Sequence, residues 1–337
     1  MADQFFSLSP DDQKNALLQA SSDLARPAFL LEKDLWVVWT LGKIFSNKIG
    51  DHLTFKGGTS LSKVYQLIDR FSEDIDLTYD IRQICTEAKT EIPPSASQAR
   101  KWGKSVRELL PVWIEQNISP LLRDALEAEG LAATLTQEGD KLYLHYRPQT
   151  PAHDYVMPRV MLEFGARSTG EPHARKRVVC DMTKAQLEGV TFPEANPIVM
   201  DVARTFWEKA TAAHVYCVQG RLRSERFARH WHDLTAIVQS QEFAGVIERR
   251  DVAALVAEHK TWFFAEKAAD GTVIDYRNAV NGGLQLVPIG EAHSSLAEDY
   301  AKMLEGGMFD TPPPPFDDLM TACTELEARL NAVAHHA

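Results

Sequence analysis

Residues 53–80, LTFKGGTSLSKVYQLIDRFSEDIDLTYD, contain the pattern that decides the fold. The apolar strand 53–55 runs into Gly57-Gly58, a pair that permits a sharp turn and a close approach of a ligand to the backbone. The next apolar residues follow the i, i+3, i+4, i+7 spacing of a helix with one buried face: Leu61, Val64, Tyr65 and Ile68. The stretch therefore predicts a strand, a glycine turn, a short helix and a second strand that carries acids.

The second strand holds two aspartates with one residue between them. Because side chains alternate along a strand, Asp74 and Asp76 are predicted on one face, with Ile75 and Leu77 on the other. Two carboxylates roughly 6–7 Å apart repel each other unless a cation lies between them. Mg²⁺ binds one or two carboxylates and fills its other positions with water and substrate phosphates. The pattern therefore predicts a metal site that receives a phosphate.

The glycine turn supplies the phosphate-binding half of this prediction. At Gly58-Thr59 the chain enters a helix, and the free N–H groups at a helix N-terminus suit a triphosphate. A G-[ST] turn, a helix and then D-x-D on the next strand is the signature of nucleotidyltransferases with a polymerase-β palm. Fourteen residues separate Thr59 from Asp74, slightly more than the usual gap.

The longer pattern KGGTSL…R-x-S-x-DIDL closely resembles the AbiEii/AbiGii family of nucleotidyltransferase toxins, the enzyme half of type IV toxin–antitoxin pairs. The resemblance implies transfer from an NTP, with two Mg²⁺ ions held by Asp74, Asp76 and a third acid. Gly58 and Thr59 would cradle the β- and γ-phosphates. The motif residues implied to bind substrate are Lys56, Gly57, Gly58, Thr59, Ser60, Lys63, Arg70 and Ser72.

Two other interpretations compete. A lone D-x-D occurs by chance in most proteins of this length, but the glycine turn and the intervening helix in the correct order favour catalysis. Residues 74–78 also match the D-x-D-x-T of haloacid-dehalogenase-type phosphatases. That motif closes an apolar N-terminal strand of a doubly wound fold, whereas Phe71-Ser72-Glu73 is a poor start and no βαβ series follows.

Composition sets the broad class. The 337 residues are long enough for two domains, and 45% hydrophobic and 25% charged residues are ordinary globular values. We find neither an apolar run of about 18 residues nor a basic, apolar leader, so we expect no membrane span, no secretion signal and a cytoplasmic location. Four widely spaced cysteines suit a reducing compartment. A net charge of −11 argues against broad nucleic-acid binding, but permits a local basic patch or a basic partner.

Residues 10–48 are predicted to be helical. Ser9 caps a first helix that has Pro10 in its first turn, and a second helix beginning near Ala28 is apolar almost all round. Glu32-Lys33-Asp34 interrupts the second helix. Two interpretations stay open. The segment is a solvated turn of helix with a local ion pair, or Lys33 contacts the substrate. The second follows from the AbiEii/AbiGii family, which carries an EKD segment at this place.

A helical insertion in the palm is predicted near residues 85–130, with a loop at 92–97 and helices at 98–117 and 120–129. The alternating residues 131–146 predict a hairpin. The strand 156–165 then places Val160, Leu162 and Phe164 on one face and Glu163 on the other.

The polymerase-β palm places a third carboxylate on a strand beside the D-x-D strand. Glu163 is the only acid of the strand 156–165, so we predict it as the third catalytic acid and metal ligand; the alternative is an edge-strand acid facing water. A basic stretch suits phosphates or an RNA backbone, or forms a solvated face: Arg159, Arg167, Arg175, Lys176 and Arg177.

A change in composition at residues 192–197 predicts a boundary between a palm domain, 1–193, and a helical domain, 194–337. Lys209 falls within an apolar stripe, where a lysine usually extends its ammonium to water. The resembling family carries E-K here, which implies that Lys209 is a catalytic cation that contacts the nucleotide's phosphates. The R-x-x-x-D-L pattern of the same family implies that Arg229 and Asp233 bind substrate. The alternative is a surface ion pair between these two residues. His230 and His232 point apart on a helix and are predicted to be structural.

The sequence therefore predicts an α+β protein: a polymerase-β-like nucleotidyltransferase palm with a mixed sheet, followed by an all-helical C-terminal domain. The resemblance implies a Mg²⁺-dependent enzyme that transfers NMP from an NTP to an RNA acceptor such as the tRNA 3′ end. It would act as the toxin of a toxin–antitoxin or phage abortive-infection pair, with a cognate antitoxin. The alternatives are transfer to a protein side chain and nucleotide binding without transfer.

Overall fold

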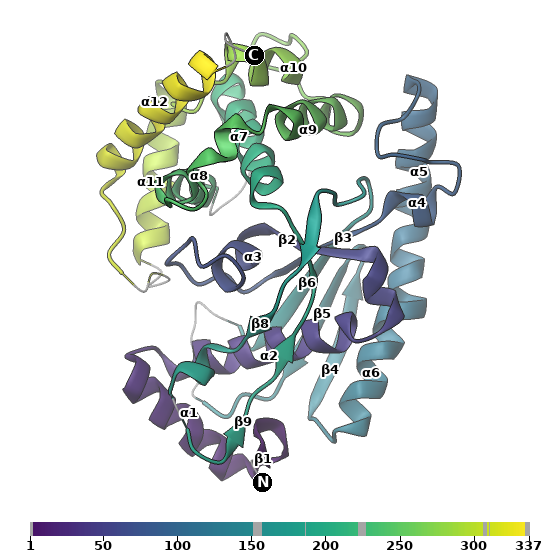
Figure 1. The fold of residues 1–337 in the computed structure, drawn as a ribbon, viewed down its shortest axis with the longest axis vertical. Coiled ribbons are helices and arrows are strands. Elements are labelled where there is room, and N and C mark those ends of the chain that lie inside the picture. Colours follow the sequence, from purple (N-terminus) through teal and green to yellow (C-terminus); the bar gives the residue numbers. More distant parts are fainter. Residues whose placement is uncertain are drawn as a thin grey trace. The chain divides into compact units, whose positions relative to one another are not determined.

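The computed structural model describes residues 3–150, 157–185, 187–221, 227–305, 309 and 311–333 (Figure 1). The chain divides into two compact units. The sheet unit comprises Met1–Val64, Phe71–Lys89 and Lys101–Met200, and the helical unit comprises Tyr65–Arg70, Thr90–Arg100 and Asp201–Ala337. The sequence did not indicate that two short early segments pack with the later helices.

Seven strands of the sheet unit form one mixed sheet, in the order β4-β5-β6-β3-β2-β11-β7. β3 is parallel to β6 and β2 is parallel to β11, whereas the other neighbouring pairs are antiparallel. The strands are β2 Leu53–Lys56, β3 Ile75–Tyr79, β4 Ala133–Glu138, β5 Lys141–Tyr146, β6 Arg159–Gly165, β7 His173–Arg175 and β11 Ile198–Met200. This mixed sheet with separate helices confirms the predicted α+β class.

Burial along the strands explains why this segment order forms a sheet. Val160, Leu162 and Phe164 of β6 are fully buried, and the residues between them are partly exposed. In β3, Ile75 and Leu77 are fully buried. This period of two anchors one face of each strand in the core. Val156, part of the predicted strand, lies outside the described residues.

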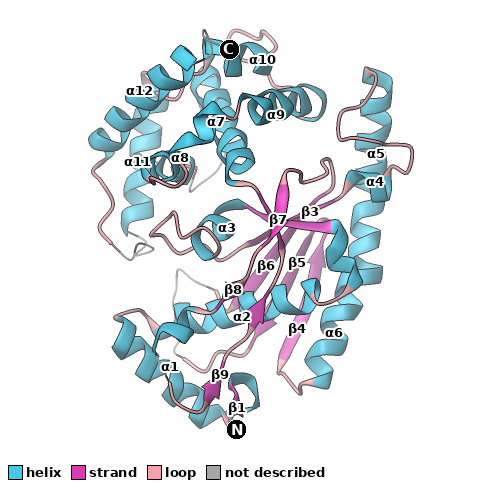
Figure 2. Cartoon of the chain, in the orientation of Figure 1, coloured by secondary structure: helices cyan, strands magenta, loops and turns pink. Residues whose placement is uncertain are grey.

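Helices cover the sheet in Figure 2, where α2 crosses in front of the central strands. Ser9 caps the first helix as predicted, because its hydroxyl accepts a hydrogen bond from the Asp12 N–H at 3.2 Å. The helices are α1 Pro10–Leu24, α2 Ala28–Phe45, α3 Gly57–Lys63, α4 Ile81–Ile84, α5 Ala96–Trp113 and α6 Ser119–Ala128. A π-turn, η3 Ile114–Ile118, joins α5 to α6. The helices predicted within residues 98–129 and the hairpin that follows them are confirmed, and their status as an insertion in the palm stays a prediction.

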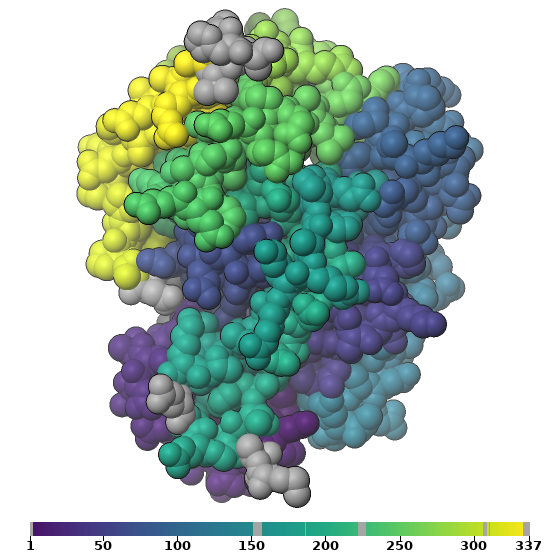
Figure 3. Space-filling model, in the orientation of Figure 1, coloured from purple at the N-terminus to yellow at the C-terminus, as the bar shows by residue number. Residues whose placement is uncertain are grey.

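Short elements complete this unit. β1 Asp3–Gln4 pairs with β9 Val190–Thr191, and β8 Val178–Val179 pairs with β10 Glu194–Ala195. The 3₁₀ turns are η1 Phe5–Ser7, η2 Lys48–His52 and η4 Asp181–Ala185. α1 packs against η4, and in Figure 3 the purple surface of α1 borders the teal surface of this later segment.

The helix after the glycine turn is shorter than predicted. It ends at Lys63, so Tyr65 and Ile68 lie outside it. Gln66 has a left-handed φ of 51°, which an α-helix cannot accommodate. The apolar spacing therefore reflects packing of a loop rather than a continued helix.

The described residues of the helical unit form helices joined by loops (Figure 1). The helices are α7 Val202–Gln219, α8 Arg229–Gln239, α9 Arg250–Phe263, α10 Tyr276–Asn278, α11 Glu291–Glu305 and α12 Phe316–Val333, with turns η5 Ala244–Glu248 and η6 Ala279–Gly283. Arg249, at φ −74° and ψ 65°, separates η5 from α9. Among the residues described, no helix is long and apolar enough to span a bilayer.

Candidate active site

The two predicted acids lie at the start of β3. Asp74 comes immediately before the strand, and Asp76 lies within it, between the fully buried Ile75 and Leu77. Both aspartates are partly exposed. The predicted alternation of acids and core residues is therefore present.

Register places Asp76 in a row of charged residues across four strands. Its partner on the antiparallel β2 is Lys56, and its partner on the parallel β6 is Glu163. Glu163 is in turn the partner of Lys141 on β5. Partners in register project from the same face of a sheet, so the order across the sheet is cation, carboxylate, carboxylate, cation.

Glu163 forms an ion pair with Lys141, its neighbour in this row. Lys141 Nζ lies 3.0 Å from Glu163 Oε2, and the Glu163 side chain is 46% exposed. The hydrogen bond to Glu163 raises the pKa of Lys141. The interior position of β6 excludes the edge-strand alternative for Glu163, although its side chain remains accessible to solvent.

Gly57 is required for its close approach to Asp76. Its φ is +78°, and a Cβ built there would lie 2.0 Å from Asp76 Oδ2. Any side chain would therefore displace the carboxylate as well as strain the backbone. This contact gives a physical reason for the first glycine of the G-G pair.

Thr59 fixes the segment that carries Asp74. Its hydroxyl donates to the Asp74 carbonyl at 2.5 Å and forms a 2.9 Å hydrogen bond with Ser72 Oγ. Thr59 is fully buried and its hydroxyl is engaged within the protein, so its predicted contact with a phosphate stays a prediction. Ser72, also predicted to bind substrate, is partly exposed beside it.

Two predicted substrate residues have internal roles instead. Ser60 is fully buried and donates to the Gly57 carbonyl at 2.9 Å. The Lys63 ammonium is buried against Asp34 and against Asp181, 2.9 Å away. Burial lowers the pKa of Lys63, but the two carboxylates outweigh it and raise the pKa. The motif did not reveal these partners because both acids are distant in sequence.

The solvated interpretation of Glu32-Lys33-Asp34 is wrong. The three residues are 3%, 3% and 1% exposed in the apolar helix α2. Each of the three has a polar partner in a different, distant segment of the chain, and this compensates its burial. Glu32 accepts from the Gln149 N–H and the Thr150 hydroxyl, both at 2.7 Å, and Asp34 accepts from the Asp181 N–H at 2.6 Å.

In the helical unit, Asp233 of α8 joins two cations. Arg70 donates to both of its carboxylate oxygens, at 2.8 and 2.7 Å, and Lys209 Nζ of α7 lies 2.9 Å away. Burial favours the neutral acid, but Arg70 and Lys209 hold the pKa of Asp233 well below its usual value. The alternative of a surface ion pair between Arg229 and Asp233 is therefore wrong, because Asp233 is completely buried. The predicted contact of these two residues with substrate stays a prediction.

Lys209 does not extend freely to solvent. Its side chain is 9% exposed. Burial lowers the pKa of Lys209, Asp233 opposes this shift, and the nearby Arg70 cation adds to it. Lys209 is thus a largely desolvated ammonium that is held in position by Asp233.

The histidines of α8 have structural surroundings. His232 Nδ1 lies 3.4 Å from Asp233 Oδ1. Burial, followed by Lys209, lowers the pKa of His230 well below its usual value, which favours the neutral ring. Within the described ranges, no group of three or more histidine, cysteine or acidic side chains has the arrangement to hold a metal. Any metal at Asp74 and Asp76 would therefore rely on two carboxylates with water and phosphate.

The basic stretch is partly neutralised by neighbouring acids. Arg175 lies 2.5 Å from Asp51 and Arg177 lies 2.6 Å from Glu194. Arg159 stacks over the Tyr143 ring, 4.7 Å from its centre. The side chains of Arg175 and Arg177 are nevertheless 44% and 73% exposed.

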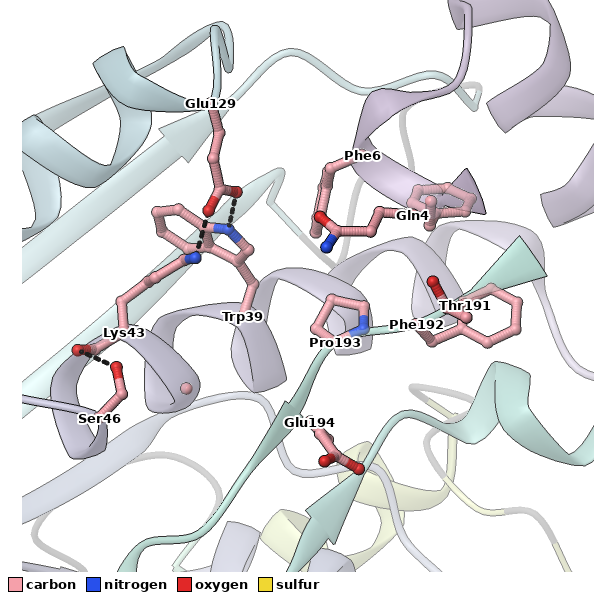
Figure 4. Close-up of a pocket in the computed structure, with 12 residues that line it drawn as sticks. Gln4, Phe6, Trp39, Lys43, Ser46, Glu129, Thr191, Phe192, Pro193 and Glu194 are labelled. Carbon is pink, nitrogen blue, oxygen red and sulfur yellow. Dashed lines mark hydrogen bonds and ion pairs between the residues drawn. The ribbon is translucent and has the colours of Figure 1, made fainter. Parts of the chain in front are cut away.

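A pocket of about 340 Å³ lies in the sheet unit at the C-terminal end of α2 (Figure 4). Its aromatic walls include Phe6, Trp39 and Phe192. Glu129 accepts a 2.8 Å hydrogen bond from the Trp39 indole and pairs with Lys43. None of the predicted site residues lines this pocket, so it is separate from the acid strand.

Comparison with known protein families identifies the family of the chain. The model of the family "Nucleotidyl transferase AbiEii toxin, Type IV TA system" matches residues 41–322. The chain belongs to this family. It is a nucleotidyltransferase toxin of a type IV toxin–antitoxin system, which implies an NTP substrate and an antitoxin partner.

One solved structure is similar to this chain. MenT4, a nucleotidyltransferase toxin from Mycobacterium tuberculosis H37Rv, is 16% identical to this chain, with a TM-score of 0.48. The match covers 95% of this chain and 92% of MenT4. No curated protein matches the chain.

Proposed function

We propose that this AbiEii-family toxin transfers an NMP group from an NTP to an RNA acceptor in a Mg²⁺-dependent reaction. The acceptor hydroxyl attacks the α-phosphorus, the bond to the β-phosphate breaks, and pyrophosphate leaves. The observation that carries the proposal is the Asp76 carboxylate, which lies against the Cβ-less Gly57 and beside Glu163.

The donor set suits Mg²⁺. Asp74 and Asp76 would hold the metal, because hard cations prefer carboxylate oxygens. Glu163 would have to turn from Lys141 towards Asp76 to serve as a third carboxylate. When bound, Mg²⁺ supplies a Lewis acid that activates a hydroxyl and neutralises a leaving pyrophosphate. Gly57 leaves room for the Asp76 carboxylate, and Thr59 fixes the backbone at Asp74.

The family pattern supports the proposal that Lys209 would supply a cation for the phosphates. Its pairing with Asp233 fixes the ammonium, and its low exposure strengthens its interaction with a developing negative charge. Asp233 and Arg70 then act through Lys209 rather than on the substrate, because the two oxygens of Asp233 are already engaged.

An RNA acceptor is supported by the exposed arginines of the basic stretch. Purified protein would be incubated with Mg²⁺, each α-phosphate-labelled NTP and total bacterial RNA. An RNA acceptor predicts label that ribonuclease removes, and predicts that the double variant Arg175→Glu, Arg177→Glu loses RNA labelling but still binds NTP. Label that survives ribonuclease and is lost with protease would instead show a protein acceptor.

A further inference from the structure

The two catalytic aspartates are held in different ways. Asp76 belongs to β3 and is fixed by pairing with β2 and β6. Asp74 precedes the strand, in the irregular segment 72–74. A residue outside a ladder needs other contacts to keep one position, and catalysis requires ligands fixed within about 0.5 Å.

One anchor of this segment comes from α2. Lys33 Nζ donates to Glu73 Oε2 at 2.5 Å and to the Met157 carbonyl at 3.1 Å. The Lys33 and Glu73 side chains are 4% and 13% exposed. Glu73 is the immediate neighbour of Asp74, and Thr59 holds the other side of the same segment through the Asp74 carbonyl.

Stability alone does not account for this ion pair. Burying two charges costs about as much as their attraction returns, so apolar replacement of such pairs is often neutral or stabilising. The pair instead connects α2 to the segment 72–74 through a hydrogen bond of fixed direction. Lys33 lies on a helix that is anchored on both sides of it, by Glu32 and by Asp34.

We propose that Lys33 and Glu73 are a positioning pair that fixes Asp74 for metal and nucleotide binding. The inference rests on the proposed function. Lys33 would act through Glu73 and would not touch the substrate. Loss of either charge would loosen residues 72–74 and leave Asp76 in place.

Two readouts test the pair in Lys33→Met, Glu73→Gln and the double variant. Amide hydrogen exchange, measured on peptides, should rise for residues 72–75 and stay unchanged for β2. The transfer rate should fall at least about tenfold with a higher Mg²⁺ requirement, and KM for the NTP should change less. Since both residues form one link, the double variant should lose no more activity than either single variant.

Glu32→Gln is the matched control. It removes a buried charge from the adjacent residue of α2, but its partners are Gln149 and Thr150. Glu32→Gln should lower the stability of the protein without raising amide exchange at residues 72–75. Lys33→Arg keeps the positive charge and should retain most of the transfer activity that Lys33→Met loses. Unchanged exchange in folded Lys33→Met, or additive losses in the double variant, would overturn the positioning role. A wild-type protein that transfers no label would refute the proposed function, and exchange would still decide the role of the pair.

Discussion

Asp76 and Glu163 are register partners on adjacent parallel strands, so their carboxylates project from the same face of the sheet. Lys56 on β2 and Lys141 on β5 flank them. Adjacent carboxylates repel each other, and this repulsion is reduced by flanking cations or by a bound metal. We therefore propose Glu163 as the acid that completes the site.

Glu163→Gln should lower the transfer activity by roughly 10–100-fold, as loss of a residue that supports a metal site typically does. It should also raise the Mg²⁺ concentration that gives the half-maximal rate. Lys141→Met is the control, because it removes the partner of Glu163 and leaves the carboxylate intact. Mg²⁺ titrations of initial rate compare the two variants. Equal, small effects would show that Glu163 is a solvated acid.

Gly57→Ala should abolish transfer, because the new Cβ would occupy the position of the Asp76 carboxylate. Gly189→Ala separates collision from backbone strain: Gly189 has nearly the same φ, +77°, but no atom lies within 4 Å of its Cβ position. Both variants should lose on the order of 1 kcal/mol through left-handed strain. Chemical denaturation and label transfer measure the two effects. An active Gly57→Ala variant would contradict the packing described.

Lys209→Met and Asp233→Asn should both inactivate the enzyme, but only the second should unfold it readily. Removal of the Asp233 charge leaves Arg70 and Lys209 buried without their carboxylate, at a cost of about 3–5 kcal/mol. Lys209→Met leaves the Arg70–Asp233 pair and should cost much less. Urea denaturation measures the difference. Equal stabilities would show that Asp233 is not the anchor of this cluster.

His214 should make stability depend on pH. Burial, aided by the Lys260 cation, lowers its pKa from 6.5 to about 4, and its Nδ1 accepts the Gln285 N–H at 3.1 Å. Between these pKa values the unfolded chain binds a proton that the folded chain excludes, so stability is full above pH 6.5 and falls towards pH 4. The loss from pH 7 to pH 5 should be about 2 kcal/mol. His214→Gln should reduce this pH dependence in urea denaturation, and an unchanged dependence would refute the assignment.

Local pattern predicted the parts of the fold that depend on local chemistry. Period-two burial in β3 and β6 and the Ser9 cap follow directly from neighbouring residues. The end of α3 did not, because a left-handed Gln66 has no apolar signature. Pairings such as Lys33 with Glu73 and Lys63 with Asp181 join distant segments, so no local spacing could reveal them.

The EKD segment is the clearest case of this limit. Three consecutive charged residues ordinarily indicate a solvated turn. The apolar residues on either side did indicate a buried helix, and charges within such a helix require partners elsewhere. That reasoning could have predicted buried pairs, but the identity of the partners depends on the tertiary fold.

The most direct test of the catalytic site compares wild type with the double variant Asp74→Ala, Asp76→Ala in label transfer from α-phosphate-labelled NTPs. With Mg²⁺, wild type should label an acceptor, and the folded double variant should give no label above background. Chelation of the metal should abolish labelling by wild type as well. Undiminished labelling by the double variant would contradict the assignment of the catalytic site to these two aspartates.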